Sequence, residues 1–334
     1  MKLNLKVSKL ANNFFFISNL SEWHFSCRKK YNDAWLKQTG NLSDLENKTI
    51  SDFRDIILKH GFEMEKSFYS FPEKEVWNKL EKKLRKSELR RLKKTFDIFN
   101  PRFEKIWEKD AVENKMKAFQ KSLNDERYCL LVENLNVFLK NRDKKKNFTV
   151  IILDSPLNEE NVTAAGGANM DDLMISLELP VLKPKSWELE YSIGILLHEI
   201  AHLLLKESDY FPYFKSVVNA KLPGLVNRNI RPRITNLEFI SELIIELLIP
   251  FGYLAQKHFI FKPLKTSFSK KNLNVLRENF KKFRQGKEAS GSRLRKTLVW
   301  RLYPVVKKYI EDKKGIDESF VQKVIKTILI EKIN

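Results

Sequence analysis

The sequence predicts an α+β chain that is mostly helical, with a small sheet near its centre. Only 10 of the 334 residues are Gly, and Leu, Ile, Lys and Glu dominate the periodic stretches, which favours helix. Residues 148–153 are apolar and β-branched, and residues 173–179 are apolar and end at Pro180, so both stretches predict strands. A chain of this length can bury its core in one large domain or in two smaller ones.

Residues 1–145 are predicted to form a basic helical region. Within it, residues 79–94 carry nine bases against Glu81 and Glu88. The simplest interpretation is an amphipathic surface helix, and a patch for an acidic partner is the alternative. Apolar residues recur at near-helical spacing across this run and beyond it: Leu80, Leu84, Leu89, Leu92, Phe96 and Phe99.

Asn100 and Pro101 are expected to break this pattern. Further helices are predicted over residues 103–119 and 129–139, before a hydrophilic loop at residues 140–147.

The two predicted strands are followed by a helix that begins near Trp187. Residues 164–169 predict the turn between the strands, and Ser186 is the expected N-cap of the helix. The helix runs to Leu205 and is apolar nearly all round, so we expect it to be buried. A second buried helix is predicted over residues 235–249, and a basic helical region follows over residues 263–334.

The charge is unevenly distributed along the chain. The formal net charge is +20, yet residues 154–202 carry nine acids and two bases, a formal −7. The rest of the chain therefore carries +27. This division predicts three functional segments, at residues 1–145, 146–262 and 263–334. The excess of bases also permits binding to nucleic acid, although Lys spread over helix surfaces is usually only solvated.

Several classes of protein are excluded by composition. No run of 18 uncharged apolar residues exists, so no membrane span is expected, and the apolar patch at residues 14–17 is too short for a signal-peptide core. Cys27 and Cys129 are the only cysteines, which excludes a disulfide framework and a Cys-rich zinc finger. A cytoplasmic location is the expectation.

The first buried helix contains the run His198-Glu199-Ile200-Ala201-His202. Residues four apart on a helix have Cβ atoms about 5–6 Å apart on one face, so the two imidazoles can converge on one zinc ion. Glu199 lies roughly a quarter-turn around, where its carboxylate can reach a zinc-bound water as a general base. A fortuitous match is the alternative, but the chain has only five His, and unpaired polar groups in an apolar helix are costly to bury.

The second buried helix offers a third ligand. Glu238, Glu242 and Glu246 stand four apart among apolar residues, so they form one acidic stripe. A catalytic zinc needs three protein ligands and an open fourth position. The alternative is that the stripe is a seam of salt bridges to the basic flanks.

With these motifs, residues 148–252 resemble the gluzincin branch of the zinc peptidases, the thermolysin-like HExxH metallopeptidases. The resemblance implies a zincin-like core in which the small sheet packs on the active-site helix, with a Glu ligand from a following helix. Glu242 is the expected ligand because it lies at the centre of the stripe, and Glu238 is the alternative. The resemblance also implies that an extended peptide pairs with the strand at residues 173–179. An oxyanion donor is needed as well, and five residues are candidates: Tyr210, Tyr213, Arg231, Arg233 and His258.

The expected function is therefore zinc-dependent hydrolysis of a peptide bond, with a peptide or protein as substrate. His198, His202 and Glu242 would hold Zn²⁺, and Glu199 would act as base and then as acid. Two alternatives remain: a nucleic-acid-binding or regulatory protein with a non-catalytic or sensing core, and a zinc hydrolase acting on a non-peptide amide or ester.

Overall fold

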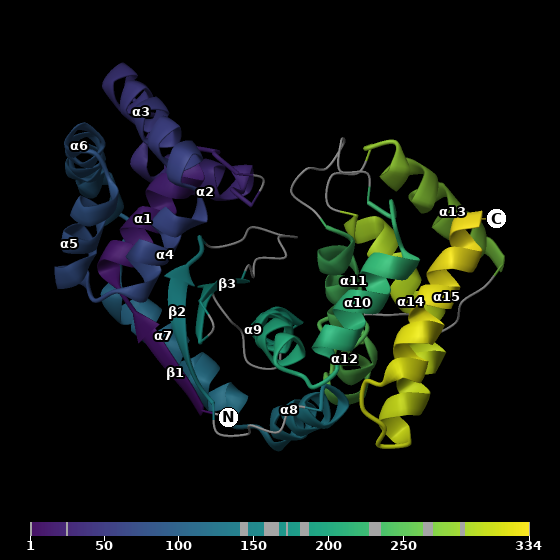
Figure 1. Cartoon of the computed structure of the whole chain (residues 1–334). Helices are drawn as coiled ribbons and strands as arrows, with labels where there is room; N and C mark the ends of the chain where they lie inside the picture. The colour runs from purple at the N-terminus through teal and green to yellow at the C-terminus, as the bar shows by residue number, and fades with distance from the viewer. Residues whose placement is uncertain are drawn as a thin grey trace. The chain divides into compact units, whose positions relative to one another are not determined.

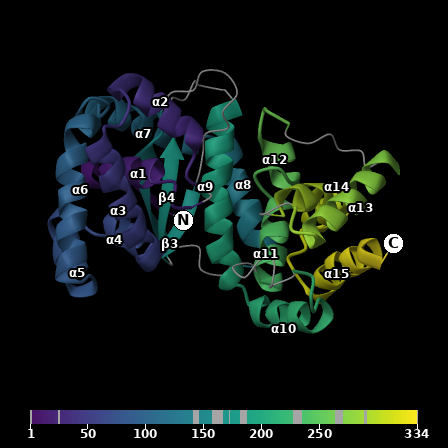
Figure 2. The same cartoon turned by 90° about the horizontal axis from the view of Figure 1, so that it is seen from above.

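The computed structural model divides the chain into two compact units, which are shown in Figures 1 and 2. The first unit comprises Met1–Ser122 and Lys146–Ser192, and the second comprises Leu123–Lys145 and Ile193–Asn334. The three functional segments predicted from the charge distribution, residues 1–145, 146–262 and 263–334, have other boundaries than these two structural units. The division into functional segments stays a prediction. The structure describes residues 2–24, 26–140, 146–156, 167–171, 173–180, 187–226, 235–262, 270–287 and 291–333.

The first unit contains a four-stranded sheet with the order β1-β2-β4-β3. β1 and β4 both run parallel to β2, and β3 runs antiparallel to β4. The strands predicted at residues 148–153 and 173–179 are confirmed as β2 (Asn147–Asp154) and β4 (Met174–Leu179). β3 (Gly167–Asp171) begins within the predicted turn, whose residues 164–166 lie outside the described residues.

β1 (Lys2–Val7) lies in a region for which only helix was predicted. Its signal was present in the sequence, because Leu3, Leu5 and Val7 alternate with polar residues. Leu3 pairs with Phe148 and Leu5 with Val150, so the strand extends the edge of the sheet beside β2.

The expectation that an extended peptide pairs along residues 173–179 is wrong for most of that strand. β4 is hydrogen-bonded to β2 along its length and to β3 from Met174 to Leu177. Since a strand with a neighbour on each side has no free backbone groups there, it cannot accept a third strand.

Helices of the first unit pack against this sheet and against one another. α1 contacts β2, and α4 contacts β3. Residues 14–17 lie in the buried part of α1, where Phe14 stacks on Phe68 with ring centroids 4.2 Å apart. The helices of this unit are α1 (Lys9–Leu20), α2 (Lys29–Thr39), α3 (Asp44–His60), α4 (Phe62–Ser70), α5 (Glu73–Lys83), α6 (Lys86–Glu104) and α7 (Lys109–Leu123, the last residue belonging to the second unit).

The basic run at residues 79–94 forms parts of two helices, α5 and α6, and not one. Its apolar residues are buried as predicted, but the helix is interrupted at Leu84 and Arg85, and α6 starts where the Glu88 carboxylate accepts from the Arg85 N–H.

The break expected at Asn100 and Pro101 is wrong, because α6 continues through Pro101 to Glu104. Phe99 and Phe103 lie one turn apart around the proline and are both buried, so packing outweighs the lost hydrogen bond. The helix predicted over residues 103–119 is accordingly displaced and begins as α7 at Lys109.

The second unit is helical throughout its described residues. α14 is its central element and contacts α8, α11, α12, α13 and α15. The predicted buried helices are confirmed as α9 (Trp187–Lys206) and α11 (Asn236–Glu246), although α11 ends three residues before the predicted limit. The other helices are α8 (Glu126–Phe138), α10 (Phe211–Lys221), α12 (Tyr253–His258), α13 (Lys270–Arg284), α14 (Ser292–Glu311) and α15 (Glu318–Ile333).

The coarse fold prediction, a mostly helical chain with one small sheet, is confirmed. The first six residues of α9 belong to the first unit and the remainder to the second. Ser186, the expected N-cap of α9, lies outside the described residues. Among the helices of the described ranges, none has the length and apolar character that a bilayer crossing requires.

One buried ion pair gives the first unit a testable dependence on pH. Arg102 binds Glu46 through Nε and also through Nη2, which lies 2.8 Å from Oε2. This contact lowers the pKa of Glu46 to about 2. Because the pKa is depressed on folding, the stabilisation is present above pH 4.5 and is lost as the pH falls towards 2.

Glu46→Gln should therefore lower the free energy of unfolding by about 1–2 kcal/mol at pH 6 and have little effect near pH 2. Urea unfolding at both pH values measures this, with Glu63→Gln as the control because Glu63 pairs with Lys83 on the surface. An equal loss at both pH values would contradict the assignment.

Candidate metal centre

α9 places His198 and His202 one turn apart on the same side of a buried helix. The residues around them, Leu197, Ile200 and Ala201, are fully buried. His198 is buried and His202 half-buried, with 11% and 17% of their side-chain surfaces exposed. Both imidazoles therefore lie at the boundary of the core, where a small ion from solvent can still reach them.

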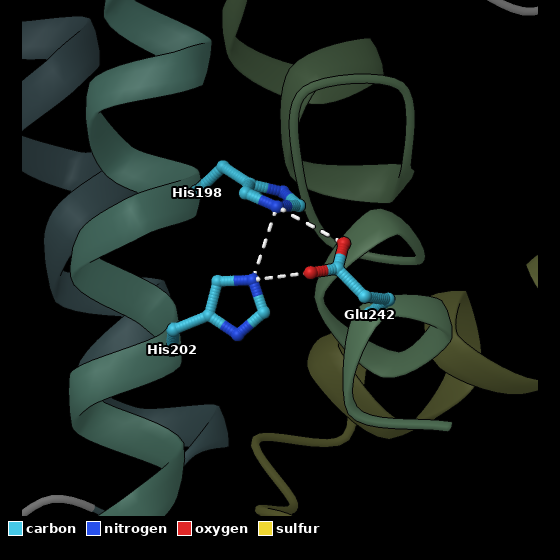
Figure 3. A group of neighbouring side chains, drawn as sticks. All are labelled: His198, His202 and Glu242. Carbon is cyan, nitrogen blue, oxygen red and sulfur yellow. Dashed lines mark hydrogen bonds and ion pairs between the residues drawn. The ribbon is translucent and has the colours of Figure 1, made fainter. Parts of the chain in front are cut away.

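α11 supplies the third side chain, Glu242. This helix starts with a capping box, in which Thr235 Oγ1 accepts from the Glu238 N–H and the Glu238 carboxylate accepts from the Thr235 N–H. The apolar residues of α11 are buried, which fixes the rotation of the helix and turns Glu242 towards α9 (Figure 3).

Three ligand atoms converge between the two helices. His202 Nε2 lies 3.0 Å from Glu242 Oε1, and His198 Nε2 lies 3.4 Å from Glu242 Oε2. The two Nε2 atoms are 3.2 Å apart. Figure 3 shows these three contacts, with the two imidazoles facing each other and each facing a different oxygen of the Glu242 carboxylate. The three residues form the group in the described chain whose ligand atoms could hold a metal ion.

The other nitrogen of His198 is held by backbone. Nδ1 lies 3.4 Å from the carbonyl oxygen of Ile249, and since a carbonyl only accepts, the proton is on Nδ1. In the neutral imidazole, this leaves the lone pair on Nε2, which is the atom that faces His202 and Glu242. A carbonyl in this position orients a metal-binding histidine and increases its basicity.

Gly194 allows α9 to come close to this carbonyl. It lies one turn before His198, and a Cβ atom at this position would stand 2.8 Å from Pro250 Cβ and 3.3 Å from the ring of Phe259. Any larger residue would push α9 away from the Ile249–Pro250 turn. The absence of a side chain at Gly194 therefore helps to set the distance from His198 to Ile249.

Arg295 on α14 occupies the space behind Glu242. Its Nε and Nη2 both lie 3.0 Å from Glu246 Oε1, so the guanidinium is fixed in one orientation. Nη2 also lies 4.0 Å from Glu242 Oε2, and the Phe239 ring is 5.8 Å from the guanidinium carbon. Glu246 therefore forms a salt bridge to the basic C-terminal region, which is the alternative that the sequence left open for the acidic stripe.

The site has a negative electrostatic potential. Burial lowers the pKa of His198, but the bond to Glu242 and the charges of Glu199, Glu242 and Glu246 outweigh it and raise this pKa to about 9. Burial raises the pKa of Glu242, yet the two imidazoles bring it well below its usual range. A potential that favours a proton on a buried imidazole also favours a divalent cation in the same place.

Glu199 follows His198 on α9 and is half-buried. Its carboxylate is near enough to His198 to contribute to the raised pKa of that imidazole. It is not one of the three converging ligands. This placement is compatible with a base beside the metal position.

The remaining candidates have other contacts. Glu238 caps α11 through the backbone of Thr235 and does not belong to the converging group. Tyr213 accepts from Gln322, and His258 contacts Asn134 on α8. Lys140 lies over the ring of Tyr210, with Nζ 4.3 Å from its centroid. Arg231 and Arg233 lie outside the described residues.

Two residues that contribute to this site were not predicted from the sequence. Ile249 acts through its backbone, which leaves no signal in the residue type. Arg295 is one of 62 basic residues, so its residue type alone does not single it out. The sequence indicated only that a buried acidic stripe needs a cationic partner, without showing which residue it is.

Comparisons of the chain with protein-family models, with curated proteins and with solved structures find no match.

Glu242→Gln should reduce the affinity for zinc by about 100-fold or more, because the variant keeps the shape of the side chain and removes a charged ligand. Glu238→Gln is the matched control from the same helix. It should leave zinc affinity within about threefold and change stability little, because the Gln amide oxygen can still accept from the Thr235 N–H in the capping box. Competition with a chromophoric chelator measures both affinities. Loss of zinc in Glu238→Gln with retention in Glu242→Gln would reverse the assignment.

Gly194→Ala should destabilise the protein, although the same change stabilises most helix interiors by about 0.5–1 kcal/mol. The new methyl group would meet Pro250 at 2.8 Å, and overpacking of this kind costs about 1–3 kcal/mol. The displaced Ile249 carbonyl should also weaken zinc binding. Thermal unfolding and the chelator assay give the two readouts, and a higher melting temperature in the variant would refute the packing argument.

Proposed function

We propose that this chain is a zinc-dependent hydrolase that cleaves peptide bonds. The observation that carries the proposal is the convergence of His198, His202 and Glu242, whose nearest nitrogen and oxygen atoms lie 3.0 to 3.4 Å apart and whose ligand atoms, one from each residue, all lie within 4.8 Å of one another. The proposal includes a zincin-like arrangement of α9 and α11, in which one helix provides two His and the other provides a Glu.

The three side chains suit zinc in geometry and in chemistry. Around a tetrahedral ion bound at about 2.0–2.2 Å, ligand atoms are separated by about 3.3–3.5 Å, close to the separations found between these three residues. Two imidazoles and one carboxylate favour zinc over magnesium or calcium, which prefer oxygen ligands alone. The same set also suits ferrous iron, so metal analysis of the purified protein is the first experiment.

When bound, zinc lowers the pKa of a coordinated water to about 7 and polarises a substrate carbonyl. The chain provides the remaining steps. His198 and His202 hold the ion in place, with His198 oriented by Ile249, and Glu242 adds the negative charge. Glu199 accepts a proton from the attacking water and then transfers it to the nitrogen of the leaving amine.

A peptide substrate is supported by the resemblance of the HExxH helix and the acidic stripe to gluzincins. A non-peptide amide or an ester would need the same metal and the same base, so it is the enzymatic alternative. The internal position of β4 removes one mode of substrate binding from the proposal, namely addition of a strand at residues 173–179.

A binding or regulatory role is the second candidate function. It is motivated by the formal charge of +20 and by the basic run on α5 and α6. In such a protein the metal would serve structure or sensing, and Glu199 would have no part in the function.

Glu199→Gln should lower the rate of peptide cleavage by about 10²–10⁴-fold while zinc binding is retained, since the amide cannot accept the proton. Cleavage of an unfolded protein such as casein, followed by mass spectrometry, measures the rate. Zinc content of the same samples gives the second readout.

Glu207→Gln is the control, because Glu207 is an exposed acid at the end of α9. It should change neither rate nor zinc content. If the zinc-loaded wild type cleaves no peptide, amide or ester substrate, or if Glu199→Gln retains the full rate, the hydrolase proposal is wrong and the binding role is favoured.

A further inference from the structure

The first unit contains a cavity of about 480 Å³ that takes no part in the proposed hydrolysis. All of its described lining residues belong to that unit, whereas His198, His202 and Glu242 belong to the second. The lining comes from α1, from the segment between α1 and α2, from α4 and from three strands of the sheet. Cavities of this size accommodate small organic ligands.

The Glu178 carboxylate lines the cavity and already has partners within the protein. Glu178 of β4 accepts a hydrogen bond of 2.8 Å from the hydroxyl of Tyr31, and Arg28 Nη2 lies 3.6 Å from the same carboxylate. Arg28 Nη1 also donates to the Tyr31 hydroxyl at 3.2 Å. The positive charge of Arg28 is thus already committed to Glu178.

The lining also contains two polar groups that lack such partners. Glu65 and Tyr69 are one turn apart on α4, and both line the cavity. Tyr69 is only 4% exposed. Among the described residues, neither the Glu65 carboxylate nor the Tyr69 hydroxyl has a hydrogen-bond partner. Both groups line the cavity, so a ligand in it can supply the hydrogen bonds that the protein does not.

The electrostatic state of Glu65 is consistent with a missing cation. Burial, followed by the charge of Glu178, raises the pKa of Glu65 to about 7. The same carboxylate contributes to the raised pKa values of Tyr69 on α4 and of Cys27 before α2, so these groups surround it. Arg28, the basic side chain of the described lining, does not contribute to the pKa of Glu65.

The walls of the cavity also contain apolar and aromatic surface. Phe15, Leu153 and the ring of Tyr69 are buried, and Phe62 is exposed. Aromatic faces attract organic cations, and the apolar surface favours a ligand with a hydrocarbon body.

We propose that this cavity binds a small organic monocation, a primary amine with an apolar or aromatic body, whose ammonium group donates to Glu65 and to the Tyr69 hydroxyl. Above pH 7, where Glu65 is ionised, and with His24 counted as neutral, the two carboxylates outnumber the one guanidinium, so a single positive charge neutralises the described lining. An anionic ligand would have to compete with Glu178 for Arg28 and would leave Glu65 without a partner.

Benzylamine, benzyl alcohol and benzoate share one ring and differ only in the charge of the attached group. Calorimetric titration of each into the full-length protein should give benzylamine an affinity at least tenfold higher than that of the other two. Glu65→Gln keeps the size of the side chain and removes its charge, so benzylamine should bind about tenfold more weakly or worse. Tyr69→Phe removes only the hydroxyl and should weaken binding about two- to tenfold.

Glu63→Gln is the matched control, because Glu63 lies on the same helix and faces solvent. Its affinity for benzylamine should equal that of the wild type. Circular dichroism and melting curves establish that each variant is folded, and the order of the three ligands in the wild type tests the proposal without any variant. Tighter binding of benzoate, absence of benzylamine binding, or equal affinities in Glu65→Gln and Glu63→Gln would overturn the proposal.

Discussion

The carboxylate of Glu242 meets the imidazoles of His198 and His202 at the edge of a helical core, and the chemistry of the second unit depends on this contact. Each of the three groups is costly to bury alone, because an unpaired charge or polar group loses its hydration. Brought together, they satisfy one another and leave their ligand atoms facing a common centre. A buried HExxH helix is thus stable only where a second helix supplies negative charge.

The second helix, α11, carries Glu242 and Glu246 one turn apart, so their carboxylates repel each other. Like charges at this spacing destabilise a helix, more so when half-buried. Arg295 resolves the repulsion by binding Glu246 through two donors and approaching Glu242 with one of them. The arginine comes from α14, which also contacts most other helices of the unit. Packing of the whole unit therefore determines where the third ligand stands.

The first unit has a different organisation around the sheet. β1 pairs with β2, although about 140 residues separate the two strands in the sequence. α1, which follows β1 directly, packs against β2. Aromatic rings fill the space between the helices, with Phe14, Phe68 and Phe96 stacked in series. Glu178 is the one charged residue of β4, and Tyr31 and Arg28 satisfy it in the way that two imidazoles satisfy Glu242.

The sequence by itself determined what depends on local spacing. Helical periodicity located α9 and α11, apolar runs ended by Pro or polar residues located β2 and β4, and the four-residue interval fixed His198 and His202 on one face. Local patterns misjudged Pro101 and overlooked β1, because burial of Phe99 and Phe103 and pairing with β2 are non-local. Between Glu238 and Glu242 the sequence favoured Glu242 only by its central place in the stripe, since both have the same spacing. Only the tertiary structure decided that Glu238 caps its helix while Glu242 faces α9, because the rotation of α11 is set by its packing.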